Sequence, residues 1–440
     1  WSSDVCSSDL LVLSTAKGVP VDQRYANNLL NEMSGTLREV ERDLGKCPEV
    51  REYERSRARL APSNNDQILT LMRDVCKRPE IEDEDRDGRV TYSTDEEHLS
   101  LIPEGECRSA ALILRWRQVD KLRGYLRAIA EGTVIAPDGL VHTIYSALRA
   151  ITGRLTSEEP NLQNIPHRTA DGRRVRDAYY AEAGKWIAAL DYGQIEARVI
   201  GMASEDERLV RYQWTGYDIH GYWAGRITDK HPKVKDWIVK TFSVDWDEKG
   251  MKTLRQEAKN KWVFPMFFGS AARSCAANLH LPEDVADDLM AEFWDEFTGV
   301  KKWQEKLVKF YEKNLYIETL GGFRRRGPTS KNELINMPVQ GTAAEIVTDA
   351  MRELSEKSFL MDDPELQPNL NIHDDLTCWL MDAGMEAKLE TIARVMCRHR
   401  FPYINVPLIV EVKVGNRWGQ MEPIREFKSN ELFNIRNPYK

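Results

Sequence analysis

Hydrophobic positions recur every three or four residues in two long stretches near the start of the chain. Between residues 23 and 45 this repeat predicts a helix, and residues 18–22 precede it as a turn and cap. Between residues 110 and 129 the repeat predicts a longer helix, with Arg117 and Lys121 sharing a face outside the apolar stripe. Such a basic face is ordinarily just solvated, but it also suits a helix that grips a phosphate backbone.

The pattern becomes strand-like after residue 185. The apolar run 186–190 predicts a buried strand that ends at Asp191, and a helical stripe follows it. Most of residues 204–320 then have helical patterns. The other predicted elements are an exposed acidic loop over 80–100, a helix over 333–358, a β-hairpin over 368–382 with His373-Asp374-Asp375 at its tip, and a strand over 406–414. This order predicts an α+β fold, because a helical front part is followed by a sheet that a helical insertion interrupts.

Composition changes this picture only in part. The chain has 440 residues, 42% of them hydrophobic, which suits two or three subdomains. Its mean hydropathy is −0.53 and no apolar run approaches a membrane span, so we expect a soluble, cytoplasmic protein without a membrane partner. Seven scattered cysteines without a Cys-x-x-Cys pair indicate neither a zinc site nor a disulfide framework.

Charge taken as a sum argues against a nucleic-acid partner, because the net charge is −8. Phosphate contacts depend on local Lys and Arg, however, and the sequence has several basic stretches. These are Arg115, Arg117, Lys121, Arg123 and Arg127; Arg168, Arg173, Arg174 and Arg176; and residues 301–326.

The first ten residues resemble the in-frame translation of a common sequencing-library adapter, and the chain starts without Met. We therefore expect residues 1–10 to be an adapter artefact on a sequence whose true start is cut off. A natural Ser-rich terminus is the alternative.

Two sets of residues carry candidate chemistry. Asp191 ends a predicted strand and Asp374 lies in a predicted hairpin, so adjoining strands could hold two divalent ions about 3.5–4 Å apart. Arg255 and Lys259 are four residues apart on one helix and run on toward aromatic residues, which suits a triphosphate with a base stacked beyond it. Taken alone, an ordinary turn and a surface ion-pair face are the more common explanations of these residues.

Five motifs, in order, resemble those of family A DNA polymerases, the DNA polymerase I-like enzymes. The resemblance runs from about residue 18 to residue 419. Residues 152–157 resemble T-G-R-L-S-S, and residues 160–166 resemble P-N-L-Q-N-I-P. Residues 191–198 resemble D-Y-S-Q-I-E-L-R, and residues 255–269 resemble the family's fingers helix. Residues 336–344 resemble N-x-P-x-Q-G-T-A-A, and residues 373–375 stand where the family has H-D-E.

This resemblance implies a right-hand polymerase that adds dNTPs to a primer 3′-hydroxyl and releases pyrophosphate. Asp191 and Asp374 would bind two Mg²⁺ ions, with Mn²⁺ as an alternative, and the Tyr192 carbonyl and Asp375 would stand beside them. Glu196 would be the steric gate against a ribose 2′-hydroxyl, and Gln194 would also bind the incoming dNTP. The incoming triphosphate would be held by Arg255, Lys259 and His220, with Lys259 as proton donor to pyrophosphate and with Phe264 and Phe268 near the sugar and the templating base.

The same resemblance places DNA contacts and subdomains. Primer–template would lie against Arg154, Asn161, Gln163, Asn336, Gln340 and His373, with Arg117 and Lys121 gripping it from the thumb. The thumb would cover 11–150, the palm 151–215 and 327–440, and the fingers 216–326. We expect a monomer that works with replication accessory proteins, and the sequence leaves open whether a 3′–5′ exonuclease domain lies upstream.

Four departures from the family pattern qualify these roles. Gly193 replaces the usual Ser, Asp375 replaces Glu and so has a shorter arm, and the stretch 321–336 is shorter than usual. One extra residue lies between Lys259 and Gly269, so either Val263 or Phe264 takes the sugar-stacking position; we favour the aromatic Phe264. Pro265 should disturb the helix there. These departures suggest a phage-like origin.

Two other functions are compatible with parts of the pattern. A single-subunit RNA polymerase shares the two-aspartate palm, although Glu196 argues against admission of a 2′-hydroxyl. A degenerate polymerase that only binds primer–template is the other, although Asp191, Asp374, Arg255 and Lys259 are all present.

Overall fold

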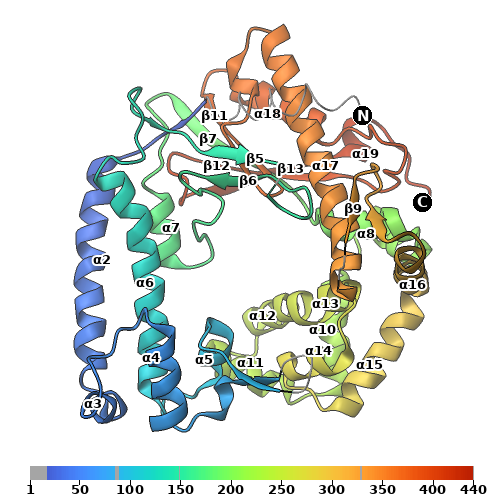
Figure 1. Cartoon of the computed structure of the whole chain (residues 1–440). Coiled ribbons are helices and arrows are strands. Elements are labelled where there is room, and N and C mark those ends of the chain that lie inside the picture. The colour runs from blue at the N-terminus through green and yellow to red at the C-terminus, as the bar shows by residue number, and fades with distance from the viewer. Residues whose placement is uncertain (1–16, 85–88, 148, 328–329, 440) are drawn as a thin grey trace.

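The computed structural model describes residues 17–84, 89–147, 149–327 and 330–439. Figure 1 shows the elements arranged in a ring, with long helices on one side, a sheet across the top and a group of shorter helices on the opposite side. The fold is α+β, as predicted.

Two long helices form the N-terminal side of the ring (Figure 1). The predicted helix over 23–45 is α2 (Gln23–Leu44), and the Asp22 side chain caps it by accepting a hydrogen bond from the Tyr25 amide. The predicted helix over 110–129 is α6 (Arg108–Ala130), which packs along α2. Their apolar stripes face one another, and the buried members on α2 are Ala26, Leu29, Met33, Leu37, Val40 and Leu44.

The prediction of a plain loop over 80–100 was wrong. The residues described there form a 3₁₀ turn (Pro79–Ile81), the hairpin strands β2 (Glu82–Glu84) and β3 (Val90–Tyr92), and the helix α5 (Glu96–Leu101). The acidic composition hid a short hairpin because β3 is exposed and so carries no apolar alternation. Nearby lie α3 (Pro48–Glu54), α4 (Asn65–Thr70) and a π-helical turn (Leu71–Val75).

The sheet has five antiparallel strands in the order β10–β11–β7–β12–β13. The predicted strand before Asp191 is β7 (Lys185–Tyr192), and it lies in the middle of the sheet. The predicted hairpin is formed by β10 (Leu370–Ile372) and β11 (Asp375–Met381), and the predicted strand over 406–414 is β12 (Ile409–Gly415). The edge strand β13 (Glu422–Lys428) was not predicted, because most of its residues are polar and exposed.

Helices cover the sheet and complete the ring. The long α17 (Lys331–Leu360) begins at a capping box made by Ser330 and Glu333. The remaining elements are β1 (Val19–Pro20), β4 (Leu140–Val141), β5 (Ile144–Ser146), β6 (Thr156–Glu158), α7 (Ala170–Arg176), α8 (Ile195–Ser204), α9 (Glu207–Thr215), α10 (Ile219–Lys230), α11 (Val234–Phe242), α12 (Glu248–Ala258), α13 (Phe264–Phe267), α14 (Ala272–Leu279), α15 (Glu283–Glu296), α16 (Thr298–Asn314), β8 (Tyr316–Glu318), β9 (Arg324–Arg326), a 3₁₀ turn (Pro364–Leu366), α18 (Met385–Met396) and α19 (Ser429–Leu432).

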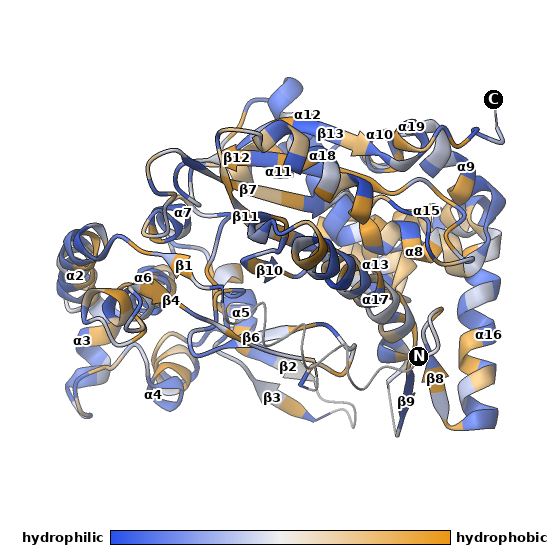
Figure 2. Ribbon diagram, turned by 90° about the horizontal axis from the view of Figure 1, so that it is seen from above, coloured by the Kyte–Doolittle hydropathy of each residue, from blue (hydrophilic) through white to orange (hydrophobic). Residues whose placement is uncertain are grey.

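The largest hydrophobic core runs from β7, β11 and β12 into α8, α10 and the helices beyond them. Its fully buried aromatic side chains include Trp223, Trp262, Phe267, Phe293 and Phe297. Figure 2 shows hydrophobic and hydrophilic residues alternating along α16, as expected of a helix with one buried side.

The chain between α12 and α13 keeps its helical course in an unusual form. Residues Lys259–Val263 form a π-helical turn, in which the Phe264 amide donates to the Lys259 carbonyl. A π turn holds one more residue than an α turn, so it takes up the extra residue found in the sequence. Pro265 follows within the first turn of α13, where a backbone N–H would have no partner within that helix, so its absence costs little. The predicted disturbance is therefore a wider turn and not a break.

Two further predictions concern the chain as a whole. Within the described ranges, no helix is long and apolar enough to cross a membrane. The cysteines that the structure describes are all free thiols, although the sulfur atoms of Cys76 and Cys107 lie 3.3 Å apart.

Gly419 offers a test of how α7 is held against the C-terminal end of the sheet. A Cβ atom at this position would overlap the backbone carbonyl of Arg173, whereas one at Gly105 would meet open space. We expect Gly419→Ala to destabilise the protein by roughly 1–3 kcal/mol, because backbone atoms cannot yield cheaply. Gly105→Ala, the control, should stay within about 0.5 kcal/mol. Urea unfolding followed by tryptophan fluorescence measures both, and equal midpoints would contradict this packing.

Candidate active site

Three carboxylates lie side by side on one rung of the sheet. Asp191 on β7 is paired with Asp375 on β11 on one side and with Glu411 on β12 on the other. Residues directly opposite one another in antiparallel strands point to the same face. The sheet therefore gathers onto one face three carboxylates that are up to 220 positions apart in the sequence.

Asp374 joins this group from the turn that precedes β11. The turn residue His373 has a φ of 59°, a left-handed conformation that non-glycine residues seldom adopt. The Asn371 side-chain amide supports it by donating to the carbonyls of His373 (3.0 Å) and Asp375 (3.3 Å). The Asp374 carbonyl accepts a hydrogen bond from the Tyr192 amide (3.2 Å), which ties the turn to the end of β7.

Burial raises the pKa values of the three aspartates at this site. Burial, followed by the charges of Asp375, Asp374 and Glu411, raises the pKa of Asp191 to about 7. Burial also raises the pKa values of Asp374 and Asp375, and a hydrogen bond from the Thr377 hydroxyl partly opposes this at Asp375. The charge of Lys413 opposes the shift at Asp191 but does not cancel it, so the site is not fully neutralised around this carboxyl.

Arg154 is the guanidinium closest to this group. It donates to Glu196 at 2.7 Å and lies 3.5 Å from an Asp374 oxygen. Burial raises the pKa of Glu196, and Arg154 opposes that shift. Arg154 was predicted to contact DNA, but in this structure it holds two acidic side chains in place.

A cavity of about 580 Å³ opens over the rung. Many of the predicted site residues line it together, from β7, α8, the π turn and the β10–β11 turn. They are Asp191, Tyr192, Gln194, Glu196, Lys259, Phe264, His373, Asp374 and Asp375.

The π turn decides which residue faces this cavity. Phe264 lines it, whereas Val263 is fully buried in the core. The Lys259 ammonium lies 5.6 Å from the centre of the Phe264 ring, and the Phe268 ring stacks beyond it at 6.1 Å. Burial, then the charge of Arg255, lowers the pKa of Lys259. The choice of Phe264 over Val263 for the cavity wall agrees with this geometry.

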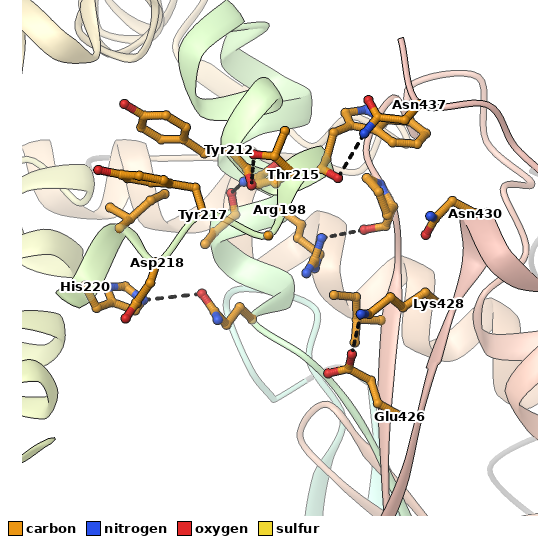
Figure 3. Close-up of a pocket in the computed structure, with 18 of the residues that line it drawn as sticks. Arg198, Tyr212, Thr215, Tyr217, Asp218, His220, Glu426, Lys428, Asn430 and Asn437 are labelled. Carbon is orange, nitrogen blue, oxygen red and sulfur yellow. Dashed lines mark hydrogen bonds and ion pairs between the residues drawn. The ribbon is translucent and has the colours of Figure 1, made fainter. Parts of the chain in front are cut away.

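Arg255 and His220 line a neighbouring cavity of about 520 Å³, which Gln194 shares. Figure 3 shows His220 and Asp218 on one side of it, opposite Glu426 and Lys428. The His220 ring lies 3.3 Å from the Gln194 side-chain oxygen and stacks on Phe264 at 5.8 Å. Burial, then the charges of Lys259 and Arg255, lowers the pKa of His220 to about 4, so this imidazole is neutral at neutral pH.

Arg255 is already paired in this structure. Its guanidinium donates to both oxygens of Asp218, at 2.8 Å from each. This pairing lowers the pKa of Asp218 and raises that of Arg255. Any phosphate that Arg255 binds must therefore compete with Asp218.

Other predicted DNA contacts lie outside both cavities. Arg117 donates to the carbonyls of Pro62 and Thr94 and to the Asn65 side chain, which fastens α6 to the chain before α4 and α5. Lys121 on the same helix is exposed. The DNA-binding roles of both residues remain predictions.

The polar motif residues near the hairpin fall into two groups. Gln163 is buried and donates to the carbonyls of Leu155 and Asn371, and Asn161 accepts from the Ser157 hydroxyl and the Asn164 amide. Asn336 and Gln340 lie one turn apart on α17 and are half-buried. Because neither of these two is hydrogen-bonded through its side chain among the described residues, both amides are free to bind a ligand.

Sequence reasoning missed several residues of this site. Glu411 and Lys413 point to the cleft face of the sheet, and Trp418 lines the cavity. Arg168 and Arg176, which the sequence indicated only as part of a basic stretch, line the same cavity. The alternation of buried Val410 and Val412 with Glu411 and Lys413 marked a two-sided strand. It could not show that this strand pairs with β7.

The donor set suits a hard divalent cation. Mg²⁺ prefers carboxylate and carbonyl oxygens, and the raised pKa of Asp191 shows that a positive charge would be favourable at this rung. Among the described residues, no three His, Cys, Asp or Glu side chains already form a closed metal site. Asp191, Asp374, Asp375 and the Tyr192 carbonyl are the groups that fit such an ion.

Comparisons with known proteins show what this chain is similar to. The family model described as DNA polymerase family A matches residues 30–420. DNA polymerase I of Chloroflexus aurantiacus is 34% identical over 350 residues, which cover 76% of this chain and 34% of that protein. The thermostable DNA polymerase I of Thermus caldophilus is 30% identical over 422 residues, which cover 93% of this chain and 47% of that protein.

A solved structure gives the same result. The POL domain of Pol1 from M. smegmatis, in complex with DNA primer–template and dNTP, superposes with a TM-score of 0.78 at 26% identity and covers 93% of this chain and 69% of that one. This chain spans less than half the length of the two curated relatives named above. Both are bacterial enzymes, so the comparisons give no support to a phage-like origin. With the family model matching most of its length, the chain belongs to DNA polymerase family A.

Proposed function

We propose that this chain is a template-directed DNA polymerase that extends a primer 3′-hydroxyl with dNTPs and releases pyrophosphate. One observation carries the proposal: Asp191, Asp374 and Asp375 line the same cavity as Lys259 and Phe264. The residues proposed to hold metal and those proposed to hold the triphosphate therefore line one space of about 580 Å³. The names of its relatives, and the primer–template and dNTP bound to the similar POL domain, support the same function.

The subdomains follow from this proposal. The thumb is assigned to 11–150, the palm to 151–215 and 327–440, and the fingers to 216–326, although residues 11–16 lie outside the described part of the chain. The sheet with its carboxylate rung is the palm, and α12 with the π turn belongs to the fingers. Fingers that close over a correct dNTP would bring Arg255 and Lys259 toward the rung. A monomer working in the cytoplasm with replication accessory proteins belongs to the same proposal.

Asp191 and Asp374 would hold two Mg²⁺ ions, with Mn²⁺ as an alternative, together with the Tyr192 carbonyl. When bound, these ions would lower the pKa of the primer 3′-hydroxyl and stabilise the charge on the leaving pyrophosphate. Asp375 has one oxygen engaged by the Thr377 hydroxyl, so its other oxygen is the one available to a metal.

The triphosphate would lie against Lys259, Arg255 and His220. Lys259 has a lowered pKa, so it gives up a proton to pyrophosphate more readily than an ordinary lysine. Neutral His220 would donate one hydrogen bond without adding charge. Arg255 would exchange its bidentate pairing with Asp218 for bidentate pairing with phosphate.

Glu196 would reject ribonucleotides by occupying the space that a 2′-hydroxyl needs. Its carboxylate is held in place by Arg154 at 2.7 Å. A fixed side chain excludes a neighbour better than a mobile one, so the Arg154 contact supports this role. It also disfavours an RNA polymerase, which must admit that hydroxyl.

Primer extension tests the reaction. On a DNA template with a 5′ overhang, dNTPs and Mg²⁺, we expect template-matched extension by the wild type. Asp191→Ala and Asp374→Ala should lower the rate by at least about 10³-fold, because each removes a metal ligand. Asp66→Ala, an exposed residue at the start of α4, is the matched control. A folded wild type that binds primer–template without extending it would leave only a binding protein.

Sugar selectivity tests the position of Phe264. We expect the wild type to discriminate strongly against dideoxynucleotides. Phe264→Tyr should accept them at least about tenfold better relative to dNTPs, because the added hydroxyl can replace the missing 3′-hydroxyl as a hydrogen-bond partner. Val263→Thr, a buried polar change at the neighbouring position, should leave that ratio unchanged. Termination assays with paired ddNTP and dNTP concentrations give the ratio. Efficient termination by the wild type would count against Phe264 as the sugar-stacking residue.

The carboxylate rung also predicts a dependence of stability on metal and pH. A carboxyl whose pKa rises on folding favours the fold while it is protonated, and this contribution is lost as pH rises from about 4 through about 7. At pH 8 in EDTA we therefore expect Asp191→Asn to melt roughly 2 °C above wild type, with a smaller difference at pH 5. Mg²⁺ should raise the melting temperature of wild type and have little effect on the variant. Identical melting of both proteins at pH 8 would contradict a raised pKa of Asp191 in the folded protein.

A further inference from the structure

Lys413 is a cation beside the carboxylate rung that none of the roles above uses. It lies on β12 two residues after Glu411 and is paired with Ala189 on β7. Its side chain is exposed and therefore stands on the same face as Asp191, Asp375 and Glu411. It lines the cavity of about 580 Å³ that those aspartates share.

The Lys413 ammonium has no hydrogen-bond or ion-pair partner among the described residues. Lys185, at the other end of β7, shows the contrast, because it forms an ion pair with Glu182 at 2.7 Å. Arg168 also lines the cavity without a salt bridge within the described ranges, and Arg173 uses one nitrogen on the carbonyls of His167 and Arg168. Lys413 does act on Asp191 and Asp375 through its charge, lowering their pKa values, but neither Lys413 nor Arg168 is committed to an ion pair within the described ranges. This wall of the cavity therefore has positive charge to offer a phosphate.

The position of this wall indicates its ligand. Lys259 and Phe264 form the wall assigned to the incoming nucleotide, and the primer 3′-hydroxyl must meet that nucleotide at the carboxylate rung. The rest of the primer strand then leads away from Lys259. A strand rises about 3.3 Å per residue, so Lys413 stands about 6.6 Å along β12 from the rung, within reach of the next phosphate for a lysine side chain.

We propose that Lys413 is a primer-positioning residue that binds the phosphodiester linking the last two nucleotides of the primer. The ammonium neutralises this phosphate and holds the 3′-hydroxyl over Asp191, and Arg168 adds charge on the same side. This inference rests on the proposed function, because it takes the rung as the site of the primer terminus. The competing reading is that Lys413 serves only to offset the acidic side chains around it.

A neutral phosphate analogue tests this contact directly. Primers would carry a methylphosphonate either at the last linkage or, as a control, six linkages further back. For wild type we expect the substitution at the last linkage to weaken primer–template binding roughly tenfold in fluorescence anisotropy. Lys413→Gln should bind the normal primer–template roughly tenfold more weakly than wild type does. Its affinity should fall little further when the last linkage is neutral. Lys185→Gln is the matched control and should respond as wild type does.

Two further readouts separate positioning from charge balance. The slope of log affinity against log salt should fall by about 0.9 in Lys413→Gln, as expected for one lost phosphate contact. In primer extension the variant should raise KM for primer–template more than it lowers kcat. A variant that shifts only the Mg²⁺ requirement, or that responds to the neutral last linkage as wild type does, would overturn the proposal. Absence of extension by wild type would instead refute the proposed polymerase function.

Discussion

Repulsion between carboxylates on one rung of the sheet is the constraint on which the rest of this site depends. Asp191, Asp375 and Glu411 are held together by backbone hydrogen bonds between three strands, so they cannot move apart. Burial and the neighbouring acidic charges together raise the pKa of Asp191, and Lys413 opposes this shift only in part. A site that stays short of positive charge is prepared for cations, whether these come as metal ions or as side chains.

The cations around this rung come from different elements. Arg154 contacts Glu196 and Asp374, Lys259 belongs to the π turn, and Lys413 lies on β12 two residues after Glu411. An acidic centre with basic surroundings is compatible with the proposed polyanionic substrate despite the net charge of −8. The sum of the charges is set mainly by the remaining surface, whereas binding depends on the local field.

The sequence predicted individual helices and strands well, but it did not predict which of them contact one another. Helices α2 and α6 and strand β7 follow from apolar spacing, because each pattern depends on residues within one element. Glu411 was missed because its partnership with Asp191 is a matter of which strands pair, and no local pattern records that. Arg117 was correctly placed on a helix, but its hydrogen bonds to Pro62 and Thr94 depend on segments more than 20 residues away. The choice between Val263 and Phe264 needed the π turn, since an α-helix and a π turn assign different faces to the same residues.

Residues that the family resemblance assigns to DNA also hold the site together, and this changes how substitutions there are understood. Gln163 donates to the Asn371 carbonyl, and Asn371 in turn donates to the carbonyls on both sides of Asp374. Tyr145 completes the support, since its hydroxyl accepts a hydrogen bond from the backbone amide of Asn371 at 2.8 Å. A change at Gln163 would therefore move the turn that carries Asp374 even if Gln163 never touched a base. Loss of activity in such a variant is better attributed to a displaced carboxylate until DNA affinity has been measured separately, because a buried amide with all its hydrogen bonds made has little left to offer a ligand.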